Sequence, residues 1–270
     1  MRGSEKVGFI GAGNMATAII KGLIQSRTYL PDQLATSDNS DKALKIISDK
    51  FGIKAMSNRD LVSACSTVVL SIKPQNMREV LEEIREELTG KHLVISIAAG
   101  IPLKMIHSII GRDIPLIRVM PNTPALVQKG ISVLARGQWA EDEHMSTAKN
   151  IFNAVGNTIE VKEDLMDAVT ALSGSGPGYV FRIMECMVSS GINIGLDPDT
   201  SLRLVIQTFL GAAYLARESN LPLSGLREMV TSPGGTTAAG LGVFEDMGLE
   251  DMIKKAVKAA YDRAMELGKG

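Results

Sequence analysis

The sequence predicts an α/β protein with two domains: a doubly wound parallel sheet in residues 1–163 and a smaller all-helical domain in residues 164–270. Short apolar runs alternate with longer segments of helical periodicity in the first part, which favours parallel strands joined by right-handed crossovers. Beyond about residue 162 only helical periodicity remains. Ten of the 26 glycines fall in three short windows, which therefore mark candidate ligand-binding turns.

Each element of the first domain follows from its local pattern. The run KVGFI at residues 6–10 is apolar and of strand length, and Leu44, Ile47 and Phe51 recur at helical spacing in the segment 41–51. The expected strands are 6–10, 34–37, 67–72 and 93–97, the expected helices are 14–25, 41–51, 76–88 and 103–110, and further strands are expected at 116–119, 130–135 and 158–161.

The second domain contains two expected helices that are almost free of charge. Residues 181–195 include only Arg182 and Glu185 as charged residues, and residues 205–215 include none. Helices that are apolar on most of their circumference must be buried, and obligate interfaces resemble a cut core. We therefore expect a dimerisation domain; an ordinary monomeric core is the alternative. The expected helices are 164–172, 179–194, 199–218, 225–230 and 249–267.

The charge balance and the rare residues argue against several classes of protein. The chain has 29 Lys and Arg against 30 Asp and Glu, with no basic stripe, so nucleic acid is not an expected partner. The two cysteines, Cys65 and Cys186, and the three histidines are scattered, so no metal site is expected. No apolar stretch reaches the length of a membrane span, and we expect a cytoplasmic protein that does not bind membranes.

A dinucleotide-binding fingerprint stands at residues 11–16, between an expected strand and an expected helix. The sequence GAGNMA fits the pattern Gly-x-Gly-x-x-Ala of a Rossmann-type domain. Gly11 permits the tight turn, Gly13 leaves room for a pyrophosphate, and Ala16 allows the helix to pack close to the strand. The N–H groups at the start of the helix are then free to bind the anion.

The choice of cofactor depends on the end of the second expected strand. Asp38 lies 25 residues beyond Gly13, where an acidic residue usually accepts a hydrogen bond from the ribose 2′-hydroxyl and favours NAD. Ser37, Asn39 and Ser40 surround it with donors suited to a 2′-phosphate. The residues alone leave the choice between NAD and NADP open.

Three later segments follow expected strands and are candidate cofactor contacts, because ligands of open parallel sheets gather at the carboxyl ends of the strands. The small residues of 97–100 allow a flat ring to lie against the backbone. Lys73 either contacts the cofactor or is a solvated lysine. Pro121 and Pro124 bracket Asn122 and fix the loop that presents its amide.

The other two glycine clusters lie in the helical domain, at residues 173–179 (SGSGPGY) and 232–237 (SPGGTT). Each is expected to precede helical structure and to expose backbone N–H groups among hydroxyls, an arrangement that holds a carboxylate without a charged side chain. Neither cluster contains a Ser/His/Asp set, so nucleophilic catalysis has no base. Hydride transfer needs none.

These motifs together resemble those of pyrroline-5-carboxylate reductase, over the whole chain. The similar segments are VGFIGAGNM at 7–15, KPQ at 73–75, MPNTP at 120–124, LSGSGP at 172–177 and VTSPGGTT at 230–237. The last two, in this order and spacing, are the specific ones. The chain departs from many relatives at Gly178, where they have alanine, and at Leu221, where they have histidine.

The resemblance implies the reduction of 1-pyrroline-5-carboxylate to L-proline by NAD(P)H, with NADP the expected cofactor and NAD possible. It implies a catalytic role for Thr237, whose hydroxyl would orient the imine nitrogen. The substrate contacts expected are Ser175, Ser232, Gly234, Gly235, Thr236 and Thr237. The cofactor contacts expected are Ile10, Gly11, Ala12, Gly13, Asn14, Met15, Ser37, Asp38, Asn58, Ser71, Ile72, Lys73, Pro74, Ile97, Ala98, Ala99 and Asn122.

Two other functions are compatible with parts of the pattern. A 3-hydroxyacid dehydrogenase also joins a dinucleotide-binding domain to a helical one, but it needs a base, commonly a lysine, and residues 164–237 contain no lysine. A catalytically silent nucleotide-binding protein is the second alternative, and the retained loop at Thr237 argues against it.

Overall fold

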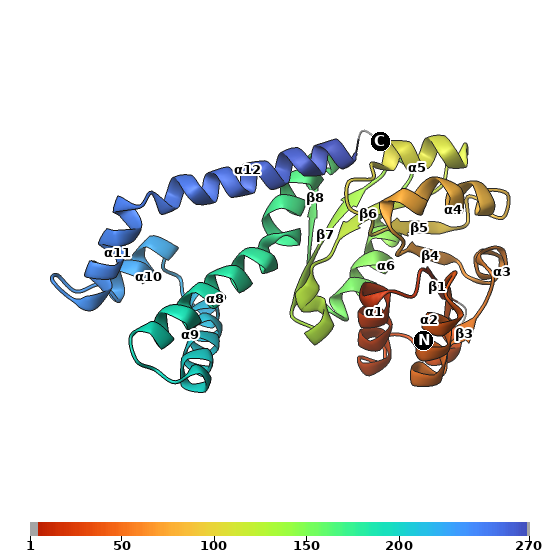
Figure 1. Cartoon of the computed structure of the whole chain (residues 1–270). Coiled ribbons are helices and arrows are strands. Elements are labelled where there is room, and N and C mark those ends of the chain that lie inside the picture. The colour runs from red at the N-terminus through yellow and green to blue at the C-terminus, as the bar shows by residue number, and fades with distance from the viewer. Residues whose placement is uncertain (1–4, 269–270) are drawn as a thin grey trace. The chain divides into compact units, whose positions relative to one another are not determined.

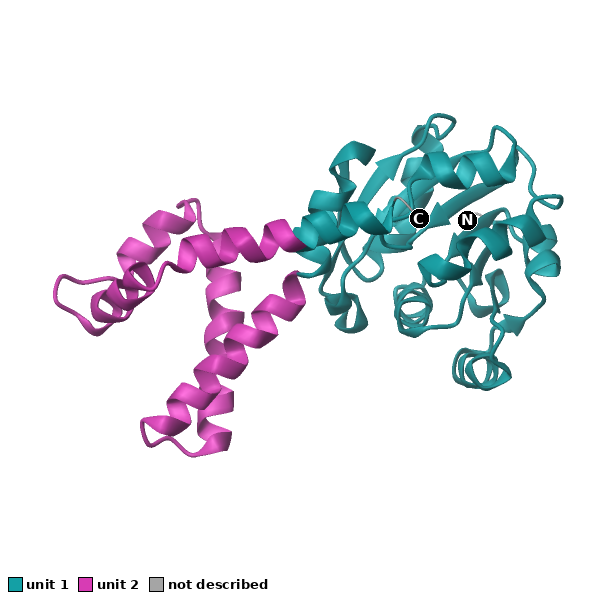
Figure 2. Ribbon diagram, turned by 45° about the horizontal axis from the view of Figure 1, so that its top comes forward, with its two compact units in different colours: residues 1–175, 260–270 teal, residues 176–259 magenta. Residues whose placement is uncertain are grey.

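The computed structural model describes residues 5–268 and forms two compact units, residues 1–175 with 260–270 (unit 1) and residues 176–259 (unit 2) (Figure 2). The segment 164–175 belongs to unit 1, together with the last turns of the C-terminal helix. The boundary expected at 163/164 lies before this division.

Unit 1 is built on an eight-stranded sheet with the order β3-β2-β1-β4-β5-β6-β7-β8 (Figure 1). Neighbouring strands pair in parallel except β6 and β7, which are antiparallel. The doubly wound, mostly parallel sheet that the sequence predicts is therefore confirmed. The strands are β1 (Val7–Ile10), β2 (Leu34–Ser37), β3 (Lys54–Ala55), β4 (Thr67–Leu70), β5 (Leu93–Ser96), β6 (Leu116–Met120), β7 (Gly130–Arg136) and β8 (Gly156–Val161).

Helices cover both faces of this sheet, and each face has its own apolar core. Every residue of β1, β2, β4 and β5 is buried, as expected for parallel strands covered on both sides. One face packs against α1 (Asn14–Gln25), α2 (Asp41–Phe51) and α6 (Asp142–Asn153). The other packs against α3 (Asn58–Ala64), α4 (Met77–Ile84) and α5 (Leu103–Ile110).

The strand order reverses between β4 and β2, which both pair with β1. At such a switch point the connections leave the carboxyl edge of the sheet in opposite directions and open a crevice. The glycine turn after β1 lies at this edge. The topology thus positions the fingerprint where a dinucleotide binds in this class of fold.

Unit 2 is helical and has almost no interior. Its helices are α8 (Gly176–Asn193), α9 (Pro198–Glu218), α10 (Leu223–Met229), α11 (Thr236–Asp246) and the part of α12 (Leu249–Leu267) up to residue 259. Within residues 176–259, only Ser201 and Val205 are buried. The Ser201 hydroxyl donates to the carbonyl of Val188 at 2.8 Å and so joins α9 to α8. None of the helices in residues 5–268 has both the length and the apolar character needed to cross a membrane.

The structure corrects several expected elements. The helix expected at 164–172 is a short 3₁₀ turn (Glu163–Leu165), α7 (Met166–Val169) and a π-helical turn (Thr170–Gly174). The glycine cluster at 173–178 was expected to precede a helix, but Gly176 and Gly178 are already inside α8. The helix expected at 76–88 is shorter at both ends: a 3₁₀ turn (Pro74–Asn76) precedes α4, and α4 ends at Ile84 in a turn over residues 85–87. Three elements, β3, α3 and α6, were not predicted. The helix α11 starts at the end of the 232–237 cluster, which was expected to precede helical structure, although no range was given for that helix.

Candidate cofactor and substrate site

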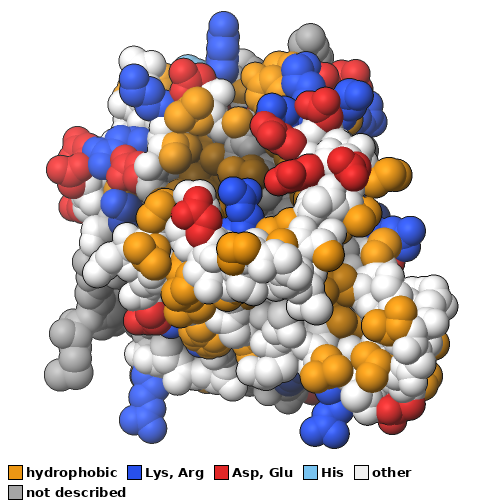
Figure 3. Space-filling view, turned by 90° about the vertical axis from the view of Figure 1, so that its left-hand side faces the viewer, with side chains coloured by type: hydrophobic (Ala, Val, Ile, Leu, Met, Phe, Trp, Pro, Cys, Tyr) orange, Lys and Arg blue, Asp and Glu red, His pale blue; other side chains and the backbone are white. Residues whose placement is uncertain are grey.

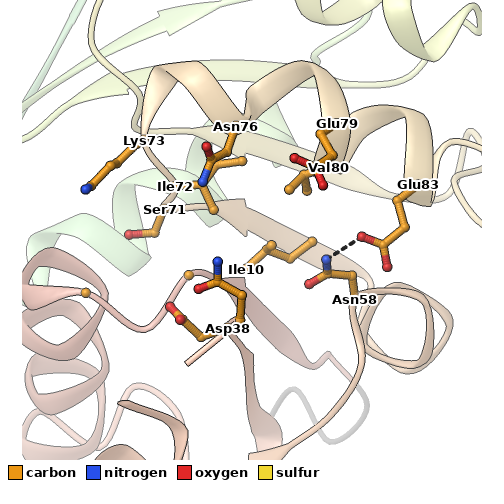
Figure 4. Close-up of a pocket in the computed structure, with 13 residues that line it drawn as sticks. Ile10, Asp38, Asn58, Ser71, Ile72, Lys73, Asn76, Glu79, Val80 and Glu83 are labelled. Carbon is orange, nitrogen blue, oxygen red and sulfur yellow. Dashed lines mark hydrogen bonds between the residues drawn. The ribbon is translucent and has the colours of Figure 1, made fainter. Parts of the chain in front are cut away.

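A cavity of about 430 Å³ opens at the carboxyl edge of β1, β2 and β4, beside α3 and α4 (Figure 4). Its walls come from the glycine turn, the turns after β2 and β4, the first residue of α3 and one face of α4. The lining residues are Ile10, Gly11, Gly13, Asp38, Asn39, Asn58, Ser71, Ile72, Lys73, Asn76, Glu79, Val80 and Glu83.

The glycine turn is held between the two strands that flank β1. The Gly11 N–H donates to the carbonyl of Ser37 at 2.7 Å, and the Ser71 N–H donates to the carbonyl of Ile10 at 2.8 Å. Gly11 has φ +103°, and a Cβ there would lie 2.3 Å from the carbonyl oxygen of Ser71. Only glycine fits this position, both for its backbone conformation and for the space it leaves.

The N-terminus of α1 is free to bind an anion. Gly13 is its N-cap and offers no side-chain hydrogen bond, and the first turn contains no acidic residue. The first helical bond runs from Thr17 to Gly13, so the N–H groups before it have no partner within the helix. A Cβ on Gly13 would meet nothing within 4 Å. The turn therefore offers donors and space for a pyrophosphate.

Asp38 braces the glycine turn through its carboxylate. One oxygen accepts the Ala12 N–H at 2.7 Å, and the other accepts the Ser40 N–H at 2.9 Å. These are charge-assisted hydrogen bonds to backbone donors. Asp38 also lines the cavity (Figure 4), so its negative charge borders that space.

The side of the cavity formed by α3 and α4 is acidic. Asn58, the first residue of α3, donates from its amide to a carboxylate oxygen of Glu83 at 2.6 Å, and Glu79 lies on the same helix as Glu83 (Figure 4). Among the lining residues, Asp38, Glu79 and Glu83 are acidic and Lys73 is the one base.

Eight expected cofactor residues line this cavity: Ile10, Gly11, Gly13, Asp38, Asn58, Ser71, Ile72 and Lys73. Sequence reasoning missed Asn76, Glu79, Val80 and Glu83, although Glu79 and Val80 each lie one turn before Glu83 on the same face of α4. Ser37 lies at the end of β2 with 2% exposure, and its hydroxyl has no hydrogen-bond partner within residues 5–268. The expected residues that do not line the cavity are Ala12, Asn14, Met15, Ser37, Pro74, Ile97, Ala98, Ala99 and Asn122.

Asn122, an expected cofactor contact, makes two side-chain hydrogen bonds within the protein. Its amide nitrogen donates to the carbonyl of Ser173 at 3.2 Å, and its amide oxygen accepts the Ile131 N–H at 3.0 Å. The side chain therefore joins three segments of unit 1 to one another.

The loop 232–237 in unit 2 forms a tight turn that leads directly into α11. Gly234 has φ +71°, and the Gly235 N–H donates to the carbonyl of Ser232 at 3.0 Å. A Cβ on Gly235 would lie 2.5 Å from the Ser232 hydroxyl oxygen. The first helical bond runs from Ala239 to Gly235, so the N–H groups of residues 236–238 precede it. The turn thus joins two hydroxyl side chains, Thr236 and Thr237, to a helix N-terminus with open donors.

Comparison with known proteins identifies similar chains over the full length. A family model described as pyrroline-5-carboxylate reductase dimerisation matches residues 163–267, and one described as NADP oxidoreductase, coenzyme F420-dependent, matches residues 6–100. The pyrroline-5-carboxylate reductase of Methanosarcina acetivorans is 40% identical, with 98% of this chain and 99% of that protein covered. The Arabidopsis thaliana protein of the same name is 37% identical, with 98% and 96% covered.

Solved structures agree with these relatives. A pyrroline-5-carboxylate reductase from Coxiella burnetii has a TM-score of 0.92 and 37% identity, with 99% of this chain and all of that chain covered. The Plasmodium falciparum pyrroline carboxylate reductase with NADP bound has a TM-score of 0.89 and 31% identity, with 98% of each chain covered.

Proposed function

The chain belongs to the pyrroline-5-carboxylate reductase family, and from this premise we propose that it reduces 1-pyrroline-5-carboxylate to L-proline with NADPH as the hydride donor. The observation that supports the proposal most strongly is that the similarity spans both the cavity-forming unit and the loop 232–237. A chain that had kept only dinucleotide binding would not need that loop.

The cavity of unit 1 suits the cofactor. The N–H groups at the start of α1 and the open space at Gly13 suit the pyrophosphate, and the amide of Asn58, at the start of α3, is a donor in the cavity wall. The Ser37 hydroxyl, at the end of β2, is buried without a partner in residues 5–268 and does not line the cavity. When bound, the cofactor supplies a hydride to the carbon of the substrate's C=N bond. The acidic Asp38 favours NADH, whereas the neighbouring Asn39 and Ser40 suit a 2′-phosphate, so NADH is expected to be used as well as NADPH.

The loop 232–237 is proposed to bind the substrate. The N–H groups at the start of α11 are donors for the carboxylate, since a helix N-terminus favours an anion. The Ser232 hydroxyl, held against Gly235, adds a further donor. No charged side chain is required, which suits a small substrate that must also accept a hydride.

Thr237 is proposed to orient the reacting bond. The protonated imine is already an electrophile, so the residues mainly have to hold its carbon within about 3 to 3.5 Å of the hydride donor. The hydroxyl of Thr237, in the first turn of α11, is proposed to interact with the ring nitrogen and to keep that bond in line. The nitrogen keeps its proton and becomes the secondary amine of proline.

Self-association is proposed to proceed through unit 2. Its helices leave many large apolar side chains exposed (Figure 3). Within residues 176–259, only Ser201 and Val205 are buried. Such a surface resembles a core cut in half. We propose that two copies associate through these helices and that the substrate site is completed in the dimer. The exposed apolar residues include Val180, Phe181, Ile183, Met187, Leu202, Leu204, Ile206, Leu210, Val243 and Phe244.

The test is turnover by the purified full chain. NADPH and NADH are each mixed with the protein, the absorbance at the nicotinamide band is followed, and 1-pyrroline-5-carboxylate is then added. Oxidation that begins only on addition of the imine, with proline as the product, supports the proposal. No oxidation with either cofactor contradicts it, and activity only on a 3-hydroxy acid with oxidised cofactor would favour the dehydrogenase alternative instead.

A further inference from the structure

Three side chains at the end of β6 hold the segment that leads into α8. Arg118, Met120 and Asn122 lie two residues apart, a spacing that places them on the same side of an extended chain. All of their contacts with this segment are within unit 1. We propose that Asn122 is a positioning residue, which fixes the turn carrying Ser175 so that this residue can contact the carboxylate of the substrate. This inference rests on the proposed function.

The first contact anchors the start of the segment. Arg118 is 5% exposed, and its guanidinium donates to a carboxylate oxygen of Asp167, in α7, at 3.1 Å. A second carboxylate, that of Glu163, lies 3.9 Å away and also accepts the Leu103 N–H at the start of α5 at 2.6 Å. The beginning of the segment is therefore tied both to β6 and to α5.

The second contact is made by Asn122 at the end of the segment. The amide donates to the Ser173 carbonyl and accepts from the Ile131 N–H, so it cannot move toward one partner without leaving the other. Its backbone is constrained as well, because Pro121 precedes it and a 3₁₀ turn (Thr123–Val127) follows it. A rigid strand end thus determines the position of the Ser173 carbonyl.

The turn between these contacts has an unusual geometry. Residues Thr170–Gly174 form a π-helical turn that ends with the Ser175 N–H donating to the carbonyl of Thr170 at 2.8 Å. Single π turns within helices are frequently found at functional sites. The hydroxyls of Thr170 and Ser173 both donate back to carbonyls four residues earlier and so remain within the helix. Ser175 is the next residue with a hydroxyl.

Met120 closes the same turn from the side. A Cβ added to Gly174 would lie 2.4 Å from the terminal methyl carbon of Met120, so the two are in close contact. The turn is thus positioned by Met120 at Gly174 and by Asn122 at Ser173, both from the end of one strand. The same strand end belongs to the sheet whose switch point forms the cofactor cavity, so the substrate-side turn is fixed to the cofactor-binding unit.

The first test replaces Asn122 by aspartate. Asn122→Asp keeps the acceptor for Ile131 but sets a carboxylate oxygen against the Ser173 carbonyl. We expect kcat/KM for the imine to fall about 10- to 100-fold, because a displacement of about 1 Å has effects of this size. The dissociation constant of NADPH should stay within about twofold of the wild-type value, because Asn122 does not line the cofactor cavity. The matched control is Asn157→Asp, which adds the same charge at an exposed position of β8.

The second test moves the turn from its other side. Gly174→Ala is expected to raise the KM for the imine, and Met120→Ala combined with Gly174→Ala is expected to return it toward the value of Met120→Ala alone. Weaker NADPH binding in Asn122→Asp, with the KM for the imine unchanged, would make Asn122 a cofactor contact and overturn the proposal. An equal rise in the KM for the imine and in the dissociation constant of NADPH would also overturn it, because it would indicate a general structural effect.

A measurement that does not depend on turnover keeps the inference separate from the proposed function. Hydrogen exchange in a peptide covering residues 170–178 reports on the bond between the Ser175 N–H and Thr170. We expect faster exchange there in Asn122→Asp than in Asn157→Asp. Equal exchange in the two variants would contradict the role of Asn122 in positioning the turn. If the wild-type chain failed to reduce the imine, the proposed function would fail, while this comparison would still decide whether Asn122 positions the turn.

Discussion

Replacing Gly13 by alanine separates cofactor binding from folding. Gly13 has φ −72° and ψ −177°, a conformation that alanine adopts, and apart from its chain neighbours nothing in residues 5–268 lies within 4 Å of the added Cβ. Alanine is a poorer N-cap than glycine, but it restricts the unfolded chain. These effects oppose each other, so the free energy of unfolding should change by less than about 1 kcal/mol.

The effect on the cofactor should be much larger, because the methyl group would occupy the space left for a pyrophosphate. Pushing the anion away from the N-terminus of α1 weakens one or two hydrogen bonds between charged and neutral groups, each contributing about 1.5 to 3 kcal/mol. Allowing for partial readjustment, we expect a loss of about 2 to 4 kcal/mol, which is about a 30- to 1000-fold rise in the dissociation constant.

Fluorescence titration with NADPH measures this dissociation constant, and thermal unfolding measures stability. Gly90→Ala is the matched control, since Gly90 is exposed and a Cβ there would meet only one atom, at 3.9 Å. Gly11→Ala should instead destabilise the fold, because its Cβ would collide with the Ser71 carbonyl. Wild-type affinity for NADPH in a folded Gly13→Ala protein would refute the assignment of this turn to the pyrophosphate.

Three further predictions concern single residues. Asp38→Ala should weaken the binding of both NADPH and NADH, because the Ala12 N–H loses its acceptor. The loss of the negative charge should also shift the ratio of kcat/KM for the two cofactors toward NADPH by about tenfold. An unchanged ratio would mean that the carboxylate does not act on the ribose. Thr237→Ala should lower kcat/KM for the imine by about 10- to 1000-fold, or about 1.4 to 4 kcal/mol, and steady-state kinetics equal to wild type would remove Thr237 from the mechanism. Burial raises the pKa of the Cys65 thiol to about 11 from 9.0, so at pH 8 it should react with iodoacetamide about 100-fold more slowly than in the unfolded chain, with a rate that rises with pH as the thiolate forms. Equal rates, measured by mass spectrometry of the Cys65 peptide, would contradict its burial.

The parts of the fold that sequence reasoning predicted well are those in which apolar periodicity is strong and the element is buried. The limits of α1 and α5 agree with the expected ranges for this reason. The helix α2 has one buried residue, Ile47, and its ends are set by the Ser40 N-cap and by Gly52 in the left-handed conformation. The missed strand β3 has two exposed residues and therefore no apolar signal. The helix α6 has only four buried positions among many polar ones, although a crossover between the parallel strands β7 and β8 requires a helix of about this length.

The antiparallel pairing of β6 and β7 also has a simple physical reason. Their connection, residues 121–129, is too short for a crossover helix, which takes a dozen or more residues. Sequence reasoning identified the glycine turn and Asp38 because their chemistry depends on residues close together in the chain. The partners of Asn122 were not predictable in this way, since Ser173 lies 51 residues away and contributes only a backbone carbonyl.

Direct transfer of hydride to the imine carbon is the central claim, and isotope transfer tests it most directly. The protein is incubated with 1-pyrroline-5-carboxylate and NADPH that carries deuterium at both positions of nicotinamide C4. The account predicts proline with one deuterium on the ring carbon that was the imine carbon, C5. Unlabelled proline, or no proline, would contradict it.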